Sequence, residues 1–336
     1  MAQVPVGAGR APGEPVGLRH LALVGPTASG KSALALGAAE HLGDVEIVSL
    51  DSMQVYRGMD IGTAKPTPGE QARVPHHLLD VADPADDWSA ARTQELARAA
   101  VAGIEARGRR ALLVGGTGLY VQAVVDDLTF PGEDLALRAE LEAATSEPGG
   151  ILAAYQELRR LDPEAAARID EHNQRRIVRA LEVIRLTGRP FSSFGAGLDR
   201  YGPPAISVQL AGIWLPRDEL ARRIARRFDE MRGAGLVAEV ERLLAAPAPL
   251  SRTAAQAIGY KEVLAHLDGA EPSLEAALAL AVRRTRTFAR RQRMWFRRDP
   301  RITWLATPTY SEALLPALLA LWEPAAAPAR PTEVHA

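Results

Sequence analysis

The chain has 336 residues, of which 47% are apolar, so it is long enough to bury one large core or two smaller ones. Its 40 Lys and Arg balance 41 Asp and Glu, which excludes an overall field that would attract nucleic acid or an anionic membrane, so any basic site must be local. No cysteine is present, which excludes disulfides, thiolate nucleophiles, zinc fingers and iron–sulfur ligation.

The two ends of the chain, residues 1–17 and 323–336, are rich in Pro, Ala and Gly and show no apolar periodicity. We therefore expect flexible tails outside the core. No run in the sequence approaches the roughly 18 apolar residues that a membrane span needs. These features predict a cytoplasmic protein that does not contact a membrane.

Three short apolar runs, at residues 20–24, 45–50 and 110–114, are typical of buried strands. Each is followed by a loop and a stretch with helical periodicity. This alternation predicts an α/β fold with a parallel sheet and crossover helices, whose first part spans residues 18–127.

After residue 127 the pattern becomes mostly helical, with apolar spacings of three and four at residues 135–144, 150–161 and 173–187. These helices predict an inserted helical subdomain over residues 128–199. A strand-like run at 206–215 then returns to the sheet. Helices at 217–232, 254–267 and 273–297 and a final strand at 301–305 complete the second part of the core, residues 200–322.

A phosphate-binding loop follows the first predicted strand and precedes a helix, where the G-x-x-x-x-G-K-[ST] pattern has its structural meaning. Its glycines allow successive N–H groups to point inward, and the helix adds the positive end of its dipole. The lysine brings an ammonium to the terminal phosphate, and the serine hydroxyl can ligate Mg²⁺. The alternative is a chance match in a Gly/Ala/Ser-rich chain. The predicted diphosphate ligands are Gly25, Pro26, Thr27, Ala28, Ser29, Gly30, Lys31 and Ser32, with Ser32 the predicted ligand of a Mg²⁺ cofactor.

Two further polar residues stand at strand ends. Asp51 follows the strand at 45–50, and Thr117 follows the strand at 110–114 within Gly115-Gly116-Thr117-Gly118. Ligands of doubly wound sheets lie at the carboxyl edge, so both side chains are predicted beside the phosphate loop. Asp51 there suits a metal ligand or a base. The alternative for each is a helix N-cap.

Arginines cluster in three places. In the helix at 217–232, Arg223 and Arg227 lie one turn apart and can reach one anion, as can Arg222 and Arg226; solvated salt bridges are the alternative. Residues 283–298 hold eight arginines and no acid, interleaved with aromatics, which favours an RNA partner. A smaller basic group lies in the predicted subdomain: Arg175, Arg176 and Arg179.

These residues resemble bacterial tRNA dimethylallyltransferases, also called tRNA isopentenyltransferases. The resemblance covers about residues 18–305, and residues 51–66 are its most specific stretch. It is carried, in the family's order, by residues 25–32, 51–56, 58–66, 75–80, 115–120, 179–183 and 258–261.

The resemblance implies a P-loop NTPase-like parallel sheet flanked by helices, with an inserted helical subdomain that binds tRNA. It implies transfer of the dimethylallyl group of dimethylallyl diphosphate to N6 of adenosine 37, next to the anticodon. Asp51 would accept a hydrogen bond or proton from that amine, and Thr117 and Arg223 would stabilise the leaving diphosphate. We expect a monomer whose partner is the anticodon stem-loop of tRNA.

The same resemblance implies a set of tRNA-contacting residues spread over six places along the chain. They are Asp51, Ser52, Met53, Gln54, Thr117, Arg138, Arg175, Arg176, Ile177, Val178, Arg179, Gln256, Gly259, Tyr260, Lys261, Arg290, Arg291, Arg293 and Arg297.

Two other function classes fit part of the pattern. A small-molecule or nucleotide kinase would also use the phosphate loop, but it leaves the basic run at 283–298 without a role. A non-catalytic RNA-binding ATPase would use that run, but it does not explain Asp51 and Thr117 beside the phosphate loop. The prenyl transfer chemistry needs all of them, together with an apolar wall for the five-carbon chain.

Overall fold

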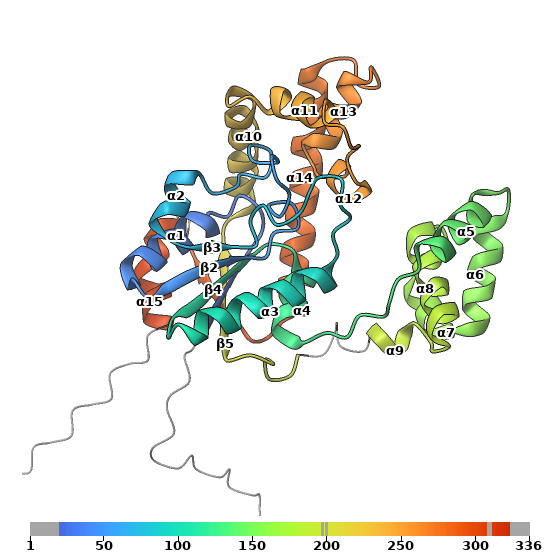
Figure 1. Ribbon diagram of the computed structural model, residues 1–336, viewed down its shortest axis with the longest axis horizontal. Helices are drawn as coiled ribbons and strands as arrows, with labels where there is room; N and C mark the ends of the chain where they lie inside the picture. The colour runs from blue at the N-terminus through green and yellow to red at the C-terminus, as the bar shows by residue number, and fades with distance from the viewer. Residues whose placement is uncertain (1–19, 196–197, 199–200, 308–310, 323–336) are drawn as a thin grey trace, which may run out of the picture.

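A six-stranded parallel sheet forms the centre of the protein in the computed structural model, which describes residues 20–195, 198, 201–307 and 311–322 (Figure 1). The expected tails at 1–17 and 323–336 lie outside these residues. The strand order is β3-β2-β4-β1-β5-β6, and every neighbouring pair is parallel, as predicted. The strands are β1 His20–Val24, β2 Val45–Ser49, β3 His76–His77, β4 Arg110–Gly115, β5 Val208–Trp214 and β6 Ile302–Ala306.

Helices cover both faces of the sheet. On one face α1 Lys31–Leu42 packs with α15 Leu315–Trp322 and the 3₁₀ turn η1 Ser311–Leu314, and on the other lie α3 Ala90–Ala106 and α4 Gly118–Asp126. Because successive strand side chains alternate between faces, Leu21 and Leu23 belong to one apolar cluster, whereas Ala22 and Val24 belong to the other. Both faces are therefore apolar, which explains the continuous hydrophobic runs of these strands.

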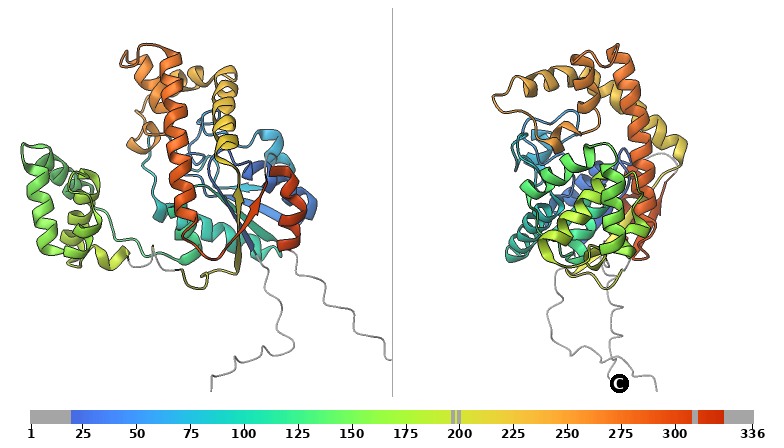
Figure 2. Two further views of the ribbon diagram at one scale, coloured as in Figure 1. Left: turned by 180° about the vertical axis from the view of Figure 1, so that it is seen from behind. Right: turned by 90° about the vertical axis from the view of Figure 1, so that its right-hand side faces the viewer.

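A layer of helices stands above the carboxyl ends of the strands (Figures 1 and 2). The longest of them, α14, runs from the top of this layer down past the sheet to β6. The short helix α2 Pro68–Arg73 lies beside the same edge and carries a capping box between Thr67 and Glu70. The layer comprises α10 Arg217–Gly233, α11 Leu236–Leu244, α12 Arg252–Ala255, α13 Tyr260–Leu267 and α14 Leu274–Phe296.

Two features of this helical layer differ from the sequence-based prediction. The helix expected at 254–267 is two helices, because Gly259 adopts φ +101° between α12 and α13. Helix α11 was not predicted, although its buried residues Leu236, Val240 and Leu243 have helical spacing.

A separate group of helices stands away from the sheet, and the extended connection at residues 128–134 leads into it (Figure 1). It buries its own apolar cluster, centred on Leu158, Ile177 and Leu181. The fully buried carboxylate of Glu182 ties its entry segment down by accepting hydrogen bonds from Arg138 and Arg179. We call this group the helical subdomain: α5 Leu135–Ser146, α6 Gly150–Leu161, α7 Pro163–Arg168, α8 Gln174–Thr187 and α9 Ser192–Gly195. Across all described residues, no helix combines the length and apolar character of a membrane span.

Candidate active site

Three loops meet at one edge of the sheet because β2, β4 and β1 are neighbours. Val24 pairs with Gly115, and Ser49 pairs with Val114, so the three strands end at the same level. The loop at 25–32 follows β1, Asp51 follows β2 and Thr117 follows β4. The fold thus brings together segments separated by up to 92 positions in the sequence.

The loop at 25–32, here called the phosphate loop, has the geometry of an anion nest. Ala28 and Gly30 adopt φ of +61° and +87°, which turns neighbouring N–H groups toward one side. Gly30 occupies the N-cap of α1 and offers no side-chain acceptor, so the first N–H groups of that helix are left for a ligand. The buried hydroxyl of Ser29 has no hydrogen-bond partner within the described chain. This loop can hold a diphosphate.

Lys31 belongs to the phosphate loop, and its ammonium lies close enough to Asp51 to feel the charge of that carboxylate. Its Nζ donates to the carbonyl of Pro26 at 3.2 Å. Burial lowers the pKa of Lys31 to about 8, the nearby Asp51 carboxylate opposes this effect, and the guanidinium of Arg227 adds to it. A bound anion would restore the missing counter-charge.

Asp51 does not cap a helix, so that alternative is wrong. Its Oδ1 accepts hydrogen bonds from the N–H groups of Met53 at 2.9 Å and Gln54 at 3.4 Å, which makes a local turn. These two bonds fix the carboxylate in place. Its second oxygen, Oδ2, has no protein partner in the part of the chain described here and remains available to a substrate.

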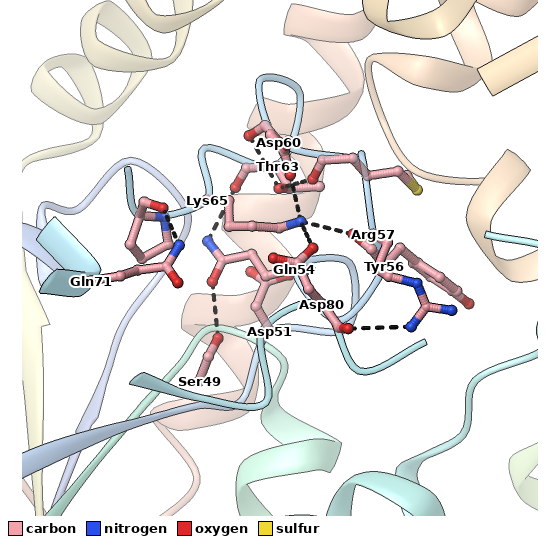
Figure 3. A network of polar contacts seen from close by, with 12 residues as sticks. Ser49, Asp51, Gln54, Tyr56, Arg57, Asp60, Thr63, Lys65, Gln71 and Asp80 are labelled. Atoms are coloured by element: carbon pink, nitrogen blue, oxygen red, sulfur yellow. Dashed lines mark hydrogen bonds and ion pairs between the residues drawn. The ribbon is translucent and has the colours of Figure 1, made fainter. Parts of the chain in front are cut away.

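The loop after Asp51 is held by a polar network (Figure 3). The buried amide of Gln54 accepts from Ser49 Oγ at 2.9 Å and donates to the carbonyls of Thr63 and Ala64. The side chain of Lys65 is 3% exposed, and its Nζ contacts Tyr56 O, Asp60 Oδ1 and Asp80 Oδ1, at 2.8, 2.6 and 2.5 Å. Residues 51–66 therefore form a rigid support for Asp51.

A second anchor ties this loop to the helical layer. The buried Glu239 on α11 accepts hydrogen bonds from the N–H groups of Asp60, Ile61 and Gly62, and from the hydroxyl of Tyr260. Gly62 lies against the Tyr260 ring so closely that a Cβ would stand 2.3 Å from its Cε2. Burial, followed by the Glu239 carboxylate, raises the pKa of Tyr260, so its hydroxyl remains a donor.

Thr117 lies at the N-cap position of α4, but its hydroxyl makes no capping hydrogen bond. It has no other partner among the described residues. Its neighbours Gly116 and Gly118 are both in close contact with α14: a Cβ on Gly116 would stand 2.7 Å from Gln292 Nε2, and one on Gly118 would stand 2.2 Å from Trp295 Cδ1. The backbone on both sides of Thr117 is therefore fixed against α14.

Two arginines of α10 face the phosphate loop. Arg223 Nη1 is 3.5 Å from the carbonyl of Ser29, and its Nε donates to Glu219 at 2.9 Å. Arg227 donates to Thr27 Oγ1 at 3.3 Å and to the carbonyl of Thr63 at 3.2 Å, and its burial lowers its pKa. The other pair, Arg222 and Arg226, is exposed and forms surface ion pairs with acids of the same helix.

Four of the expected tRNA contacts have buried side chains. Ile177 and Val178 belong to the apolar cluster of the helical subdomain, because they occupy the inner face of α8. Gln54 is used inside the network described above, and Tyr260 is fully buried against Gly62. Their side chains do not reach an RNA in this arrangement.

Three of the expected arginine contacts are engaged within the protein. Arg138 and Arg179 pair with Glu182. Arg293 donates to the carbonyl of Leu215 and lies 3.9 Å from the ring centroid of Trp214.

Another group of the expected contacts is exposed: Arg175 and Arg176 on α8, Gln256 after α12, and Arg290, Arg291 and Arg297 at the end of α14. Ser52, Met53 and Lys261 are half-buried, and Gly259 is buried. Arg175 also acts on Tyr120 beside the catalytic edge: burial raises the pKa of this tyrosine, and the Arg175 charge partly offsets the effect.

Known proteins match this chain over most of its length. The family described as IPP transferase matches residues 54–299. A tRNA dimethylallyltransferase of Streptomyces coelicolor is 51% identical over 89% of this chain and 94% of its own, and one of Bifidobacterium longum is 49% identical over 85% and 86%. The crystal structure of a tRNA isopentenylpyrophosphate transferase from Bacillus halodurans is similar with a TM-score of 0.63, at 40% identity over 89% of this chain and 94% of that one. The chain belongs to the IPP transferase family.

In this member of the IPP transferase family, sequence reasoning missed the roles of three residues at the site. Arg227 was noticed only as the partner of Arg223, yet it makes the contacts between the phosphate loop and residue 63. Glu239 gave no signal apart from being an acid on the apolar face of a helix. Gln292 is a polar residue on the buried face of α14, between Ala289 and Phe296, and that position was the available signal.

Proposed function

We propose that this protein transfers the dimethylallyl group of dimethylallyl diphosphate to N6 of adenosine 37 of tRNA and releases diphosphate. Membership of the IPP transferase family supports the reaction class. The substrate and the roles of the residues are inferred from one observation. The phosphate loop, the Asp51 carboxylate with one unused oxygen and the unused Thr117 hydroxyl lie at the same edge of the sheet. A monomer acting in the cytoplasm is part of this proposal.

The phosphate loop binds the diphosphate. The N–H groups at the start of α1 and the hydroxyl of Ser29 are free to donate to its oxygens. Lys31 contributes a positive charge once protonated, and Arg223 on α10 reaches the same loop at the carbonyl of Ser29. Because these donors recognise only the diphosphate, the prenyl chain projects away from the loop.

In the reaction, a bond forms between N6 and C1 of the prenyl group, while the bond from C1 to the diphosphate oxygen breaks and its electron pair leaves on the diphosphate. Asp51 Oδ2 accepts the proton that the amine loses. Its orientation is fixed by the two backbone bonds to Oδ1. Thr117, Arg223 and Lys31 stabilise the charge that develops on the departing diphosphate.

A Mg²⁺ cofactor fits this donor set as part of the proposal. The exposed hydroxyl of Ser32 is a hard oxygen ligand of the kind Mg²⁺ prefers, and the bound diphosphate would supply further oxygens. The described residues contain no cluster of three or more His, Cys, Asp or Glu that would hold a metal without a substrate. The ion would supply charge neutralisation to the diphosphate.

The RNA would lie across the exposed arginines of α8 and α14, and adenosine 37 would leave its stack to reach Asp51. Unstacking costs about a few kcal/mol, which phosphate contacts elsewhere on the RNA must offset. Arg290 and Arg291 stand two residues or fewer from Gln292, whose amide touches the catalytic loops. RNA binding and catalysis thus share one helix.

The test is incubation of the purified protein with tRNA and dimethylallyl diphosphate, followed by mass analysis of the nucleosides. We expect a gain of one dimethylallyl group on adenosine 37. Calorimetric titration should show binding of dimethylallyl diphosphate, which Lys31→Ala abolishes. Tight ATP binding with hydrolysis that needs no tRNA, and no heat from the prenyl diphosphate, would instead support a kinase or an ATPase.

A further inference from the structure

One buried amide joins the phosphate loop to the Thr117 turn. Gln292 on α14 accepts a hydrogen bond from the N–H of Thr27 at 2.8 Å and donates one from Nε2 to the carbonyl of Gly116, also at 2.8 Å. Because one partner is a donor and the other an acceptor, the orientation of the amide is fixed. These contacts link segments 265 and 176 positions apart in the sequence.

The fit around this amide leaves no room for another arrangement. Gln292 is 6% exposed, and a Cβ on Gly116 would approach its Nε2 to 2.7 Å, the carbonyl of Gly25 to 3.2 Å and Lys31 Nζ to 3.3 Å. One turn further along α14, Trp295 packs on Gly118. Helix α14 therefore holds the backbone on both sides of Thr117.

We propose that Gln292 is a positioning residue that sets the distance between the bound diphosphate and the Thr117 hydroxyl. The proposal rests on the prenyl transfer function given above. Gln292 touches neither substrate: its two polar atoms are used by the protein backbone. Arg290 and Arg291 lie on the exposed side of the same helical turn. An RNA that docks on α14 would therefore contact the turn that carries Gln292 and its two hydrogen bonds.

The expected consequence is a loss of turnover without a loss of binding. Gln292→Met keeps the length of the side chain but removes both hydrogen bonds, so the Thr117 turn can move relative to the phosphate loop. A displacement of about 1 Å in a reacting geometry costs roughly 10²-fold in rate. We expect kcat to fall by about that factor, with the Kd values for tRNA and for dimethylallyl diphosphate unchanged.

The experiment compares the full-length wild type, Gln292→Met and Gln292→Glu in single-turnover transfer to a tRNA transcript, with thermal unfolding and both Kd values measured on each. Gln292→Glu retains an oxygen that can accept from the N–H of Thr27, but it places a second oxygen against the carbonyl of Gly116. If Gln292→Met does not fold, Gln292→Glu takes its place in the comparison. Gln94→Met is the matched control, because the Gln94 amide on α3 donates to Asp127 at the C-cap of α4, and neither residue contacts the phosphate loop or the Thr117 turn.

The outcomes are distinct. A low rate with wild-type binding in the Gln292 variants, and a wild-type rate in Gln94→Met, supports the proposal. A wild-type rate in folded Gln292→Met overturns the proposal. A weaker tRNA Kd with an unchanged kcat at saturating tRNA also overturns it, because Gln292 would then be an RNA contact. If the wild type itself transfers no prenyl group, the proposed function fails rather than this inference.

Discussion

Binding of dimethylallyl diphosphate should take up a proton near pH 8. The free protein holds Lys31 with a pKa of about 8, chiefly because its ammonium is buried. A bound diphosphate places negative charge beside the same ammonium and raises its pKa. The bound state therefore holds more protons than the free state at pH values above about 8, and affinity must fall as the pH rises through this range.

The size of the effect follows from the free pKa. With Lys31 fully protonated in the complex, the apparent Kd scales with one plus ten raised to the difference between pH and pKa. A pKa of about 8 then gives roughly tenfold weaker binding at pH 9 than at pH 7, and an uptake of about half a proton per ligand at pH 8.

Calorimetric titration at pH 8 in two buffers of different ionisation enthalpy measures the proton uptake directly, and neither buffer should be phosphate, because that anion competes for the loop. Lys31→Arg is the matched control, since a guanidinium stays charged throughout this range and its binding should not depend on the buffer. Identical heats for the wild type in both buffers, with Kd constant from pH 7 to 9, would refute the reasoning.

Asp51→Asn should bind dimethylallyl diphosphate normally but lose roughly 10²-fold or more in kcat, because the amide cannot accept the proton of the amine; near-normal single-turnover rates would make Asp51 a spectator. Replacing the exposed Arg290 and Arg291 by Gln should weaken tRNA binding and reduce the log–log salt slope by about 0.7 to 0.9 for each lost phosphate contact, as measured by filter binding at several salt concentrations; an unchanged slope contradicts RNA contact. Gly62→Ala should destabilise the fold by about 1–3 kcal/mol in denaturant unfolding, because its Cβ meets a buried ring at 2.3 Å, whereas Gly69→Ala, with nothing within 4 Å, should not; equal stability of the two variants excludes a steric role for Gly62.

The central part of the fold could be predicted because local signals and the sheet agree. Apolar runs marked β1, β2 and β4, and the residue that follows each run lies at the catalytic edge because parallel neighbours end together. The two-residue strand β3 was not predictable, since His76 and His77 form it only by pairing with β2. The break before α13 depends on the left-handed Gly259, which single-sequence periodicity does not reveal.

The chemical groups of the site could be named from motifs, but their supports could not. The hydrogen bond from Thr27 to Gln292 spans 265 positions, and no local pattern encodes it. The same limit applies to Ile177 and Tyr260, whose side chains are buried: a motif identifies a segment, whereas the packing of that segment decides which of its side chains face inward.

The two groups of exposed arginines lie on separate bodies, so in the proposed complex the RNA would be held at two separate points. Arg175 and Arg176 belong to a helical subdomain with its own core, whereas Arg290 and Arg291 belong to a helix packed on the sheet. Once an RNA is held by one group, the other meets it at an effective concentration of about millimolar, provided that the RNA can span both. An oligonucleotide too short to span both groups would gain none of this avidity, so on the proposed binding mode the overall dimensions of the RNA would decide its affinity before any base reaches Asp51.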